Sequence, residues 1–156
     1  MSGNALHPIV LAPGEGQPFN AFGVSLLLKT TGAQSDGEWF VLEGTAPPNS
    51  PGPAPHWHKV TTEIFVILAG EMTFRVGEQT RKVGPGGYAY IPPGVNHTFA
   101  NESDTPVNYL GIASPARLEG YFHELMARVQ SGDWPPQDMG EVVALMERYD
   151  SYPVVE

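Results

Sequence analysis

The stretch PHWHKVTTEIFVILAG, residues 55–70, places two histidines one residue apart and a glutamate five residues after the second of them. On an extended strand, residues i and i+2 point to the same face, so His56 and His58 are predicted to present their imidazoles side by side. An ordinary core strand needs no imidazoles. With Glu63 close by, the pattern indicates a metal site, although an HxH pair alone is a weak signal.

A third imidazole, His97, follows the turn Pro92–Pro93–Gly94 on a short predicted strand. Three imidazoles and the Glu63 carboxylate form a suitable ligand set for a divalent first-row metal, with open positions if the ion is six-coordinate. The chain has no cysteine, so any metal is held by nitrogen and oxygen. The other histidines, His7 and His123, are interpreted as ordinary surface or core residues.

The composition describes a globular chain that is large enough for one domain. It has 156 residues, 41% of them apolar, and a net charge of −9. The acidic balance argues against nucleic acid, because a phosphate backbone requires clusters of Lys and Arg. No apolar run approaches the length of a membrane span, and MSGNALHPIV lacks the pattern of a secretory signal. We therefore expect a cytoplasmic protein without membrane or nucleic-acid partners.

Short apolar segments separated by Gly and Pro turns dominate the first two-thirds of the chain. Eight or so strands at even spacing predict an all-β sandwich or small barrel. The pattern also predicts that the strands on either side of Ala69–Gly70–Glu71 form a hairpin. The expected strands include residues 24–30, 38–45, 88–91, 96–100 and 107–113.

Helical spacing appears only near the end of the chain. From Pro115, apolar residues recur at three and four positions until Gly132, which indicates a helix with a glycine stop. A second helix is predicted for roughly Asp138 to Arg148, after the linker DWPPQD at 133–138. We expect these two helices to cap the β body.

The spacing of the histidines and glycines resembles the first motif of the cupin family. That motif runs glycine, five residues, HxH, three or four residues, Glu, six residues, Gly. His56, His58, Glu63 and Gly70 fit it, whereas Ser50 stands where the leading glycine is expected. The nearest glycine is Gly52, so the departure concerns the loop that leads into the motif.

The second cupin motif fits throughout, with Gly86, Pro92, Gly94, His97 and Asn101 at the family spacing. The motifs cover residues 50–70 and 86–101. The resemblance implies a single jelly-roll β-barrel, with its N-terminal strands, over residues 1–114 and a helical cap of the same domain over 115–156. It also implies one divalent transition metal ion (Fe, Mn, Ni, Co, Cu or Zn) held by the three histidines and Glu63. Asn101 is interpreted as a strand-end or turn residue.

Within the cupins, the chain is similar to quercetin 2,3-dioxygenase-like proteins, in the 55–77 stretch and in the two C-terminal helices. In that group the metal binds a flavonol or related enol, the glutamate removes its proton and dioxygen cleaves the ring. The resemblance therefore makes Glu63 the catalytic residue, as ligand, as base, or as both. Strand alternation and the helix start suggest an aromatic, apolar substrate pocket from Phe65, Met72, Phe74, Tyr90, Phe99, Tyr109, Tyr121 and Phe122.

Two other functions remain open from the residues alone. The same site can serve a non-oxidative isomerase or decarboxylase, because a metal-stabilised enolate is common to these reactions. A cupin barrel can also bind metal and a small molecule without catalysis. In each case the expected partner is a small molecule, and the resemblance is compatible with a homodimer, because cupins often pair through edge strands.

Overall fold

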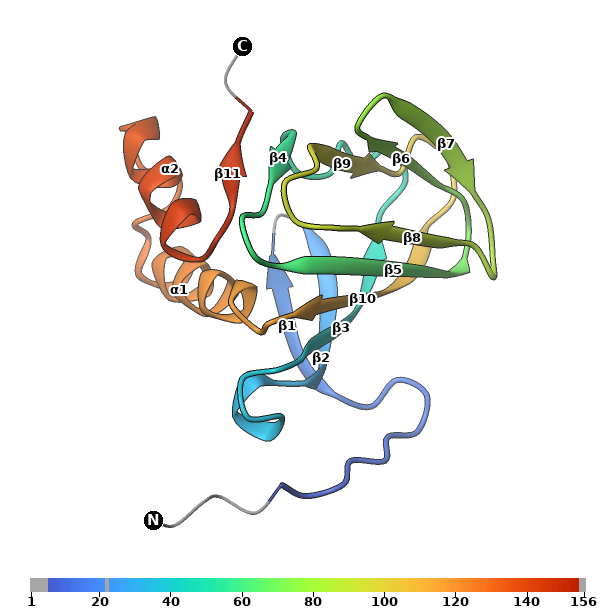
Figure 1. Ribbon diagram of the computed structural model, residues 1–156, viewed down its shortest axis with the longest axis horizontal. Helices are drawn as coiled ribbons and strands as arrows, with labels where there is room; N and C mark the ends of the chain where they lie inside the picture. Colours follow the sequence, from blue (N-terminus) through green and yellow to red (C-terminus); the bar gives the residue numbers. More distant parts are fainter. Residues whose placement is uncertain (1–5, 22, 155–156) are drawn as a thin grey trace.

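The strands of this chain form two sheets that face each other around an apolar interior (Figure 1). The computed structural model describes residues 6–21 and 23–154. One sheet has six strands in the order β1-β2-β3-β10-β5-β8, and the other has five in the order β11-β4-β9-β6-β7, among the described residues. The arrangement is a jelly roll with two C-terminal helices, which confirms the predicted fold class.

The six-stranded sheet contains the longer strands, and its central members alternate between buried and partly exposed side chains. Along β10, every second residue from Val107 to Ala113 is buried, as expected for a strand with one face on the core. The strands are β1 (Gln17–Ala21), β2 (Val24–Thr30), β3 (Phe40–Ala46), β10 (Val107–Ser114), β5 (Thr62–Ala69) and β8 (Tyr88–Ile91). A short 3-10 helix, η1 (Gly32–Gln34), lies between β2 and β3.

The five-stranded sheet carries shorter strands. Its members are β11 (Tyr152–Pro153), β4 (His56–Trp57), β9 (His97–Ala100), β6 (Met72–Val76) and β7 (Gln79–Val83). Met72 and Phe74 of β6 are buried and face Phe65 and Ile67 of the other sheet in one apolar cluster. The metal-site candidates therefore lie between the two sheets.

The predicted hairpin across Ala69–Gly70–Glu71 is wrong. β5 pairs with β10 and β8, whereas β6 pairs with β7 and β9, so the chain crosses from one sheet to the other at this turn. Gly70 has a φ of 79°, and a Cβ there would collide with the backbone around Pro106. A turn pattern predicts that the chain reverses, but the pairing partners of the flanking strands depend on contacts distant in the sequence.

The two helices are α1 (Leu118–Ser131) and α2 (Met139–Arg148). Gly132 ends α1 in the left-handed conformation with a φ of 82°, as its position predicts. Asp138 caps α2 by accepting a hydrogen bond from the Gly140 amide at 2.8 Å. No helix within residues 6–21 and 23–154 is long and apolar enough to cross a membrane.

After α2 the chain leaves the helices and returns to the five-stranded sheet. Two residues, Tyr152 and Pro153, form β11 and pair antiparallel with Trp57 and His56 of β4. Figure 1 shows β11, in red, lying beside β4 on the side of the molecule where the helices pack. This return was not predicted from the sequence, and it brings the last described residues to the histidine strand.

Candidate metal centre

Four side chains separated by up to 41 positions in the chain converge between the two sheets. His56 lies on β4, His58 follows it, Glu63 is the second residue of β5 and His97 begins β9. One nitrogen from each imidazole and one oxygen from Glu63 all lie within 4.8 Å of one another. The structure thus brings together the four residues that the motif spacing singled out.

One pairing between strands brings two of the imidazoles together. His56 pairs directly with His97 across β4 and β9, and their ring centroids are 4.3 Å apart. His58 lies two residues further along, and its ring centroid is 5.0 Å from that of His56. Glu63 reaches the group from the opposite sheet.

Each imidazole is oriented by a hydrogen bond from its Nδ1 atom to a backbone carbonyl. His56 bonds to Ala54 at 2.9 Å and His97 to Val95 at 2.9 Å. A carbonyl oxygen only accepts, so Nδ1 carries the hydrogen and Nε2 presents a lone pair in the neutral ring. These two anchors come from residues two positions earlier in the chain.

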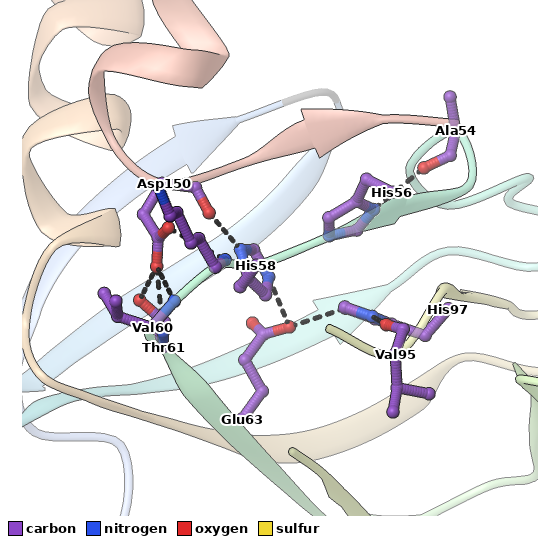
Figure 2. Close-up of polar contacts among 10 residues, drawn as sticks. Ala54, His56, His58, Val60, Thr61, Glu63, Val95, His97 and Asp150 are labelled. Atoms are coloured by element: carbon purple, nitrogen blue, oxygen red, sulfur yellow. Dashed lines mark hydrogen bonds and ion pairs between the residues drawn. The ribbon is translucent and has the colours of Figure 1, made fainter. Parts of the chain in front are cut away.

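His58 is anchored differently. Its Nδ1 bonds at 2.7 Å to the carbonyl of Asp150, a residue far along the chain that lies just after α2 (Figure 2). All three rings therefore use Nδ1 for a backbone carbonyl, the arrangement that fixes the orientation and tautomer of metal-binding histidines.

Glu63 faces two of the Nε2 atoms. Its Oε2 lies 3.0 Å from Nε2 of His58 and 2.8 Å from Nε2 of His97. When both rings are neutral, lone pairs on the nitrogens and on the carboxylate point at the same place. These lone pairs repel one another, and a cation between them removes the repulsion. The three nitrogens and one oxygen therefore fit a divalent first-row ion.

The charges of the cluster are strongly coupled. Burial of His56 and the nearby charge of His97 lower the pKa of His56 to about 4, which keeps this ring neutral near pH 7. Burial also works against a charged His58, but the hydrogen bond and charge of Glu63 outweigh it and raise the pKa of His58 above its ordinary value.

Glu63 is held ionised. Its burial acts to raise its pKa, but the hydrogen bonds with His58 and His97 outweigh burial and keep the pKa well below the ordinary range. Only 1% of the His58 and His97 side chains is exposed, compared with 14% of the Glu63 side chain. The cluster is thus more open to solvent at Glu63 than at these two imidazoles.

Aromatic side chains fill the interior next to the cluster. Phe65 lies two residues beyond Glu63 and Phe99 two residues beyond His97, and their ring centroids are 4.9 Å apart. Tyr109 lies 5.9 Å from Phe99 and is buried. Met72 and Phe74 belong to the same buried group. These five predicted pocket residues form one contiguous apolar wall.

The remaining predicted pocket residues lie elsewhere. Phe122 of α1 packs against Phe19 at 5.8 Å and Phe40 at 5.6 Å, and Tyr121 packs against Phe122. Burial raises the pKa of Tyr121 to about 12. These α1 residues therefore dock the helix on β1 and β3.

Tyr90 does not face the interior. Its side chain is 54% exposed, because Ile91, which pairs with Glu63, takes the inward position at the end of β8. Alternation correctly places Tyr88 and Tyr90 on one face, and that face is the outer one. The placement of Tyr90 in an interior pocket is therefore wrong.

Asn101, at the end of the second motif, and the loop that leads into the first motif both serve the fold and hold no ligand atom of the cluster. Asn101 is buried, and its amide nitrogen bonds to the carbonyls of Pro47 and Thr105 at 2.9 and 2.8 Å. It directly follows the end of β9, in agreement with its interpretation as a strand-end or turn residue. Gly52 has a φ of 69°, and a Cβ there would overlap the carbonyl of Phe99. The close approach in this loop thus falls at Gly52, while Ser50 forms a bridge to Asn101.

A surface hollow of about 610 Å³ lies over the first strands, away from the cluster. None of its lining residues belongs to the four-residue group, and Glu43 is its charged member. We assign it no role. Its walls are Pro18, Phe19, Asn20, Ser25, Leu26, Leu27, Glu43 and Thr45.

Comparison with known proteins agrees with this geometry. Residues 42–113 match the family described as cupin domain. The match spans the whole of both motifs, and it confirms the resemblance drawn from them.

Two curated relatives are enzymes. Quercetin 2,3-dioxygenase of Bacillus subtilis (strain 168) is 25% identical over 118 residues, which are 76% of this chain and 34% of that protein. H2HPP isomerase of Bacillus subtilis is 39% identical over 77 residues, 49% of this chain and 32% of that protein. The chain thus spans about a third of the length of these relatives.

Solved structures agree on the fold. A predicted oxalate decarboxylase from Thermotoga maritima superposes with a TM-score of 0.62 at 20% identity, covering 69% of this chain and 99% of that one. An RmlC-like cupin from Shewanella frigidimarina superposes with a TM-score of 0.59 at 16% identity, covering 70% and 92%. At these identities the likeness supports the cupin fold alone.

Proposed function

We propose that this cupin is a metal-dependent dioxygenase that acts on a flavonol-like or other enolic aromatic small molecule. His56, His58, Glu63 and His97 hold one divalent transition metal ion in this proposal. The supporting observation is the convergence of four ligand atoms within 4.8 Å, with each imidazole Nδ1 already bonded to a carbonyl. The similarity to a quercetin 2,3-dioxygenase supports the choice of reaction.

The ion would supply Lewis acidity that favours the ionised form of an enol. Glu63 accepts the proton that the enol hydroxyl gives up. Its Oε2 faces two imidazoles, whereas its Oε1 has no hydrogen-bond partner among the described residues. Because Oε2 is engaged with the two imidazoles, Oε1 is the atom at which the proton is received.

The apolar wall beside the cluster suits a flat ring. Phe65 and Phe99 stand next to Glu63 and His97 along their strands, and Tyr109 continues the wall. We place the ring of the substrate against these side chains and its enol oxygen toward Glu63. An aromatic ligand gains stacking contacts there that an aliphatic enol of similar acidity does not.

Oxygen uptake tests the proposal. Metal-stripped protein, reloaded separately with Fe(II), Mn(II), Co(II), Ni(II), Cu(II) or Zn(II), is offered a flavonol and simpler enols. We expect uptake with at least one metal, lost in Glu63→Gln and retained in Glu102→Gln, which alters an exposed carboxylate paired with Arg75. No uptake with any metal would overturn the oxygenase assignment. Retained ligand affinity without turnover would then indicate a binding protein.

A non-oxidative isomerase is the second candidate, and the 39% identity with H2HPP isomerase over 77 residues favours it. It uses the same Glu63 to move a proton on an enolisable substrate, without dioxygen. Product analysis under strictly anaerobic conditions separates the two candidates. Turnover of an enolisable substrate without oxygen would remove the oxygenase, and an isomeric product would identify an isomerase rather than a decarboxylase.

We also propose that the chain forms a homodimer through the edge of the six-stranded sheet. β8 is an edge strand of that sheet, and Tyr88, Tyr90 and neighbouring Leu68 are 59%, 54% and 47% exposed. Exposed apolar edges favour pairing with another chain. Light scattering of wild type and Tyr90→Lys tests this, with a shift to monomer expected in the variant and a monomeric wild type contradicting it.

A further inference from the structure

One residue outside the four-residue cluster, Asp150, contacts His58 and the three residues that follow it. Asp150 follows α2 and is 4% exposed, with a φ of 65°. Its carboxylate accepts hydrogen bonds from three consecutive amides, Lys59 at 2.9 Å, Val60 at 3.0 Å and Thr61 at 2.8 Å. The hydroxyl of Thr61 donates a fourth at 2.7 Å (Figure 2).

This carboxylate is fully engaged and ionised. Burial acts to raise the pKa of Asp150, but the hydrogen bonds from the Thr61 hydroxyl and the backbone amides outweigh it and hold the pKa below its ordinary range. Four donors around one buried carboxylate are charge-assisted bonds, which are stronger than neutral ones. Residues 59–61 are therefore held tightly against Asp150.

Residues 59–61 are also the whole connection between His58 and β5, which begins at Thr62 and carries Glu63. The backbone carbonyl of Asp150 accepts the Nδ1 hydrogen of His58 at 2.7 Å. We infer that Asp150 is a positioning residue of the metal centre, which sets the orientation and tautomer of His58 and its separation from Glu63. This inference rests on the proposed metal role of these residues.

Asp150 belongs to a segment that is itself fixed from the helical side. We call residues 149–154 the C-terminal strap. The hydroxyl of Tyr149 donates to Oε2 of Glu124 on α1 at 2.9 Å. The Tyr149 ring lies so close to Gly120 that a Cβ there would overlap it. The helical layer thus determines where the C-terminal strap begins.

The other end of the C-terminal strap is fixed on the histidine strand. Tyr152 stacks on Trp57 with ring centroids 4.7 Å apart and an interplanar angle of 24°. The amide of Val154 donates to the carbonyl of Pro55 at 3.0 Å. Because these contacts flank His56, the C-terminal strap stabilises β4 along its outer edge, and Asp150 lies between two anchored ends.

The positioning role has a consequence that a purely structural role lacks. Without the carbonyl of Asp150 in place, both neutral tautomers of His58 become available, and only the Nδ1–H form presents a lone pair at Nε2. If residues 59–61 become mobile, the distance between His58 and Glu63 is also no longer fixed. Metal affinity should therefore fall by more than overall stability explains.

The test uses the full chain and Co(II) alone as the probe. Asp150→Gly keeps a residue that tolerates the positive φ while it removes the carboxylate, and Asp150→Asn keeps one acceptor. Thr61→Val removes one donor. The matched control is Asp138→Ala, which weakens the start of α2 without touching the C-terminal strap. Readouts are Co(II) affinity, its visible spectrum, and ¹⁵N shifts of His58 in metal-free protein.

We expect Asp150→Gly to weaken Co(II) binding by about 10- to 100-fold, the usual range for partners of metal ligands, and to change the spectrum. Asp150→Asn and Thr61→Val should show smaller losses, and Asp138→Ala none. In metal-free protein, at a pH high enough to deprotonate His58, the ¹⁵N shifts should report a single Nδ1–H form of His58 in wild type and mixed tautomers in Asp150→Gly.

Unchanged affinity, spectrum and ¹⁵N shifts in the Asp150 variants would overturn the inference. If Asp150→Gly does not fold, Asp150→Asn and Thr61→Val carry the same comparison. If wild type binds no metal, the proposed metal function fails, and the ¹⁵N shifts of His58 still decide whether Asp150 sets the tautomer.

Discussion

The two sheets of this protein hold their parts of the candidate site in different ways. β10 pairs with β3 over the whole of Val107–Ala113 and with β5 over Asn108–Ser114. β5 also pairs with β8, so Glu63 stands on a strand that is hydrogen-bonded on both sides. β4, in contrast, pairs with β9 at one position and with β11 at two.

This difference shows which contacts fix the positions of the four side chains. Sheet pairing positions Glu63, whereas His56 and His58 have little backbone pairing around them. Their order comes from individual hydrogen bonds to carbonyls and from the C-terminal strap. Changes near β4 should therefore disturb metal binding first, and changes in the six-stranded sheet should disturb the fold first.

The largest effect is expected when a ligand is removed on the weakly paired side. His58→Ala should lower metal affinity by more than about 100-fold, because even partners of metal ligands are worth 10- to 100-fold. Competition titration against a chelator measures it. The control is His123→Ala, an imidazole that is half exposed on α1 and pairs with Glu119, for which no change is expected. Equal affinities for the two variants would contradict the assignment.

A core substitution in the six-stranded sheet should have the opposite effect: it should lower the stability of the fold and leave metal affinity unchanged. Ile67→Ala removes a side chain that is 1% exposed and should lower the free energy of unfolding by about 2–5 kcal/mol. Denaturant titration measures this. Leu68→Ala, its neighbour at 47% exposure, should cost less than about 1 kcal/mol. The folded fraction of Ile67→Ala should keep its metal affinity, and a parallel loss of affinity would break the comparison.

Acid should weaken the metal-free protein through His56. Its pKa is lowered from 6.5 to about 4 in the folded chain. Between pH 6.5 and about pH 4, the unfolded chain therefore binds a proton at His56 and the folded chain does not. Stability therefore falls as the pH drops from about 6.5 to about 4, by at most about 3 kcal/mol.

His58 acts in the opposite sense, because its raised pKa adds stability at low pH that is lost as the pH rises through that pKa. Denaturant titrations of metal-free wild type and His56→Gln between pH 7 and pH 4.5 separate the two. A stability profile that is identical in the variant would contradict the assignment to His56.

The smallest effect concerns the helical layer. Asp138→Ala removes the cap of α2 and should cost about 1 kcal/mol of folding free energy. Metal affinity should be unchanged at temperatures where the variant is folded, since the C-terminal strap is anchored by Glu124 and Trp57 rather than by this cap. A fall in affinity equal to that of Asp150→Gly would show that helix stability alone governs the site.

Local sequence patterns predicted many of the elements well. The apolar runs at 24–30 and 88–91 coincide with β2 and β8, and Gly132 ends α1 where its position indicated. The motif spacing named the four residues that converge. These features succeed because strand periodicity, helix stops and tight turns are encoded within a few neighbouring residues.

Other features depended on contacts between distant segments. The turn at Gly70 reads as a hairpin, yet β5 and β6 belong to different sheets. Tyr90 alternates as expected, but the identity of the inward face is set by the pairing of Ile91 with Glu63. Alternation gives two faces and cannot say which of them a second sheet will cover.

The sequence by itself determined that two imidazoles share a strand face, that a glutamate and a third imidazole follow at cupin spacing, and that two helices follow the strands. Only the tertiary structure decided that Asp150 clamps residues 59–61 and anchors His58. No local pattern signals this, because an aspartate after a helix resembles any other end of a helix. Its partners lie about 90 positions away and meet it only when α1, α2 and β4 pack together.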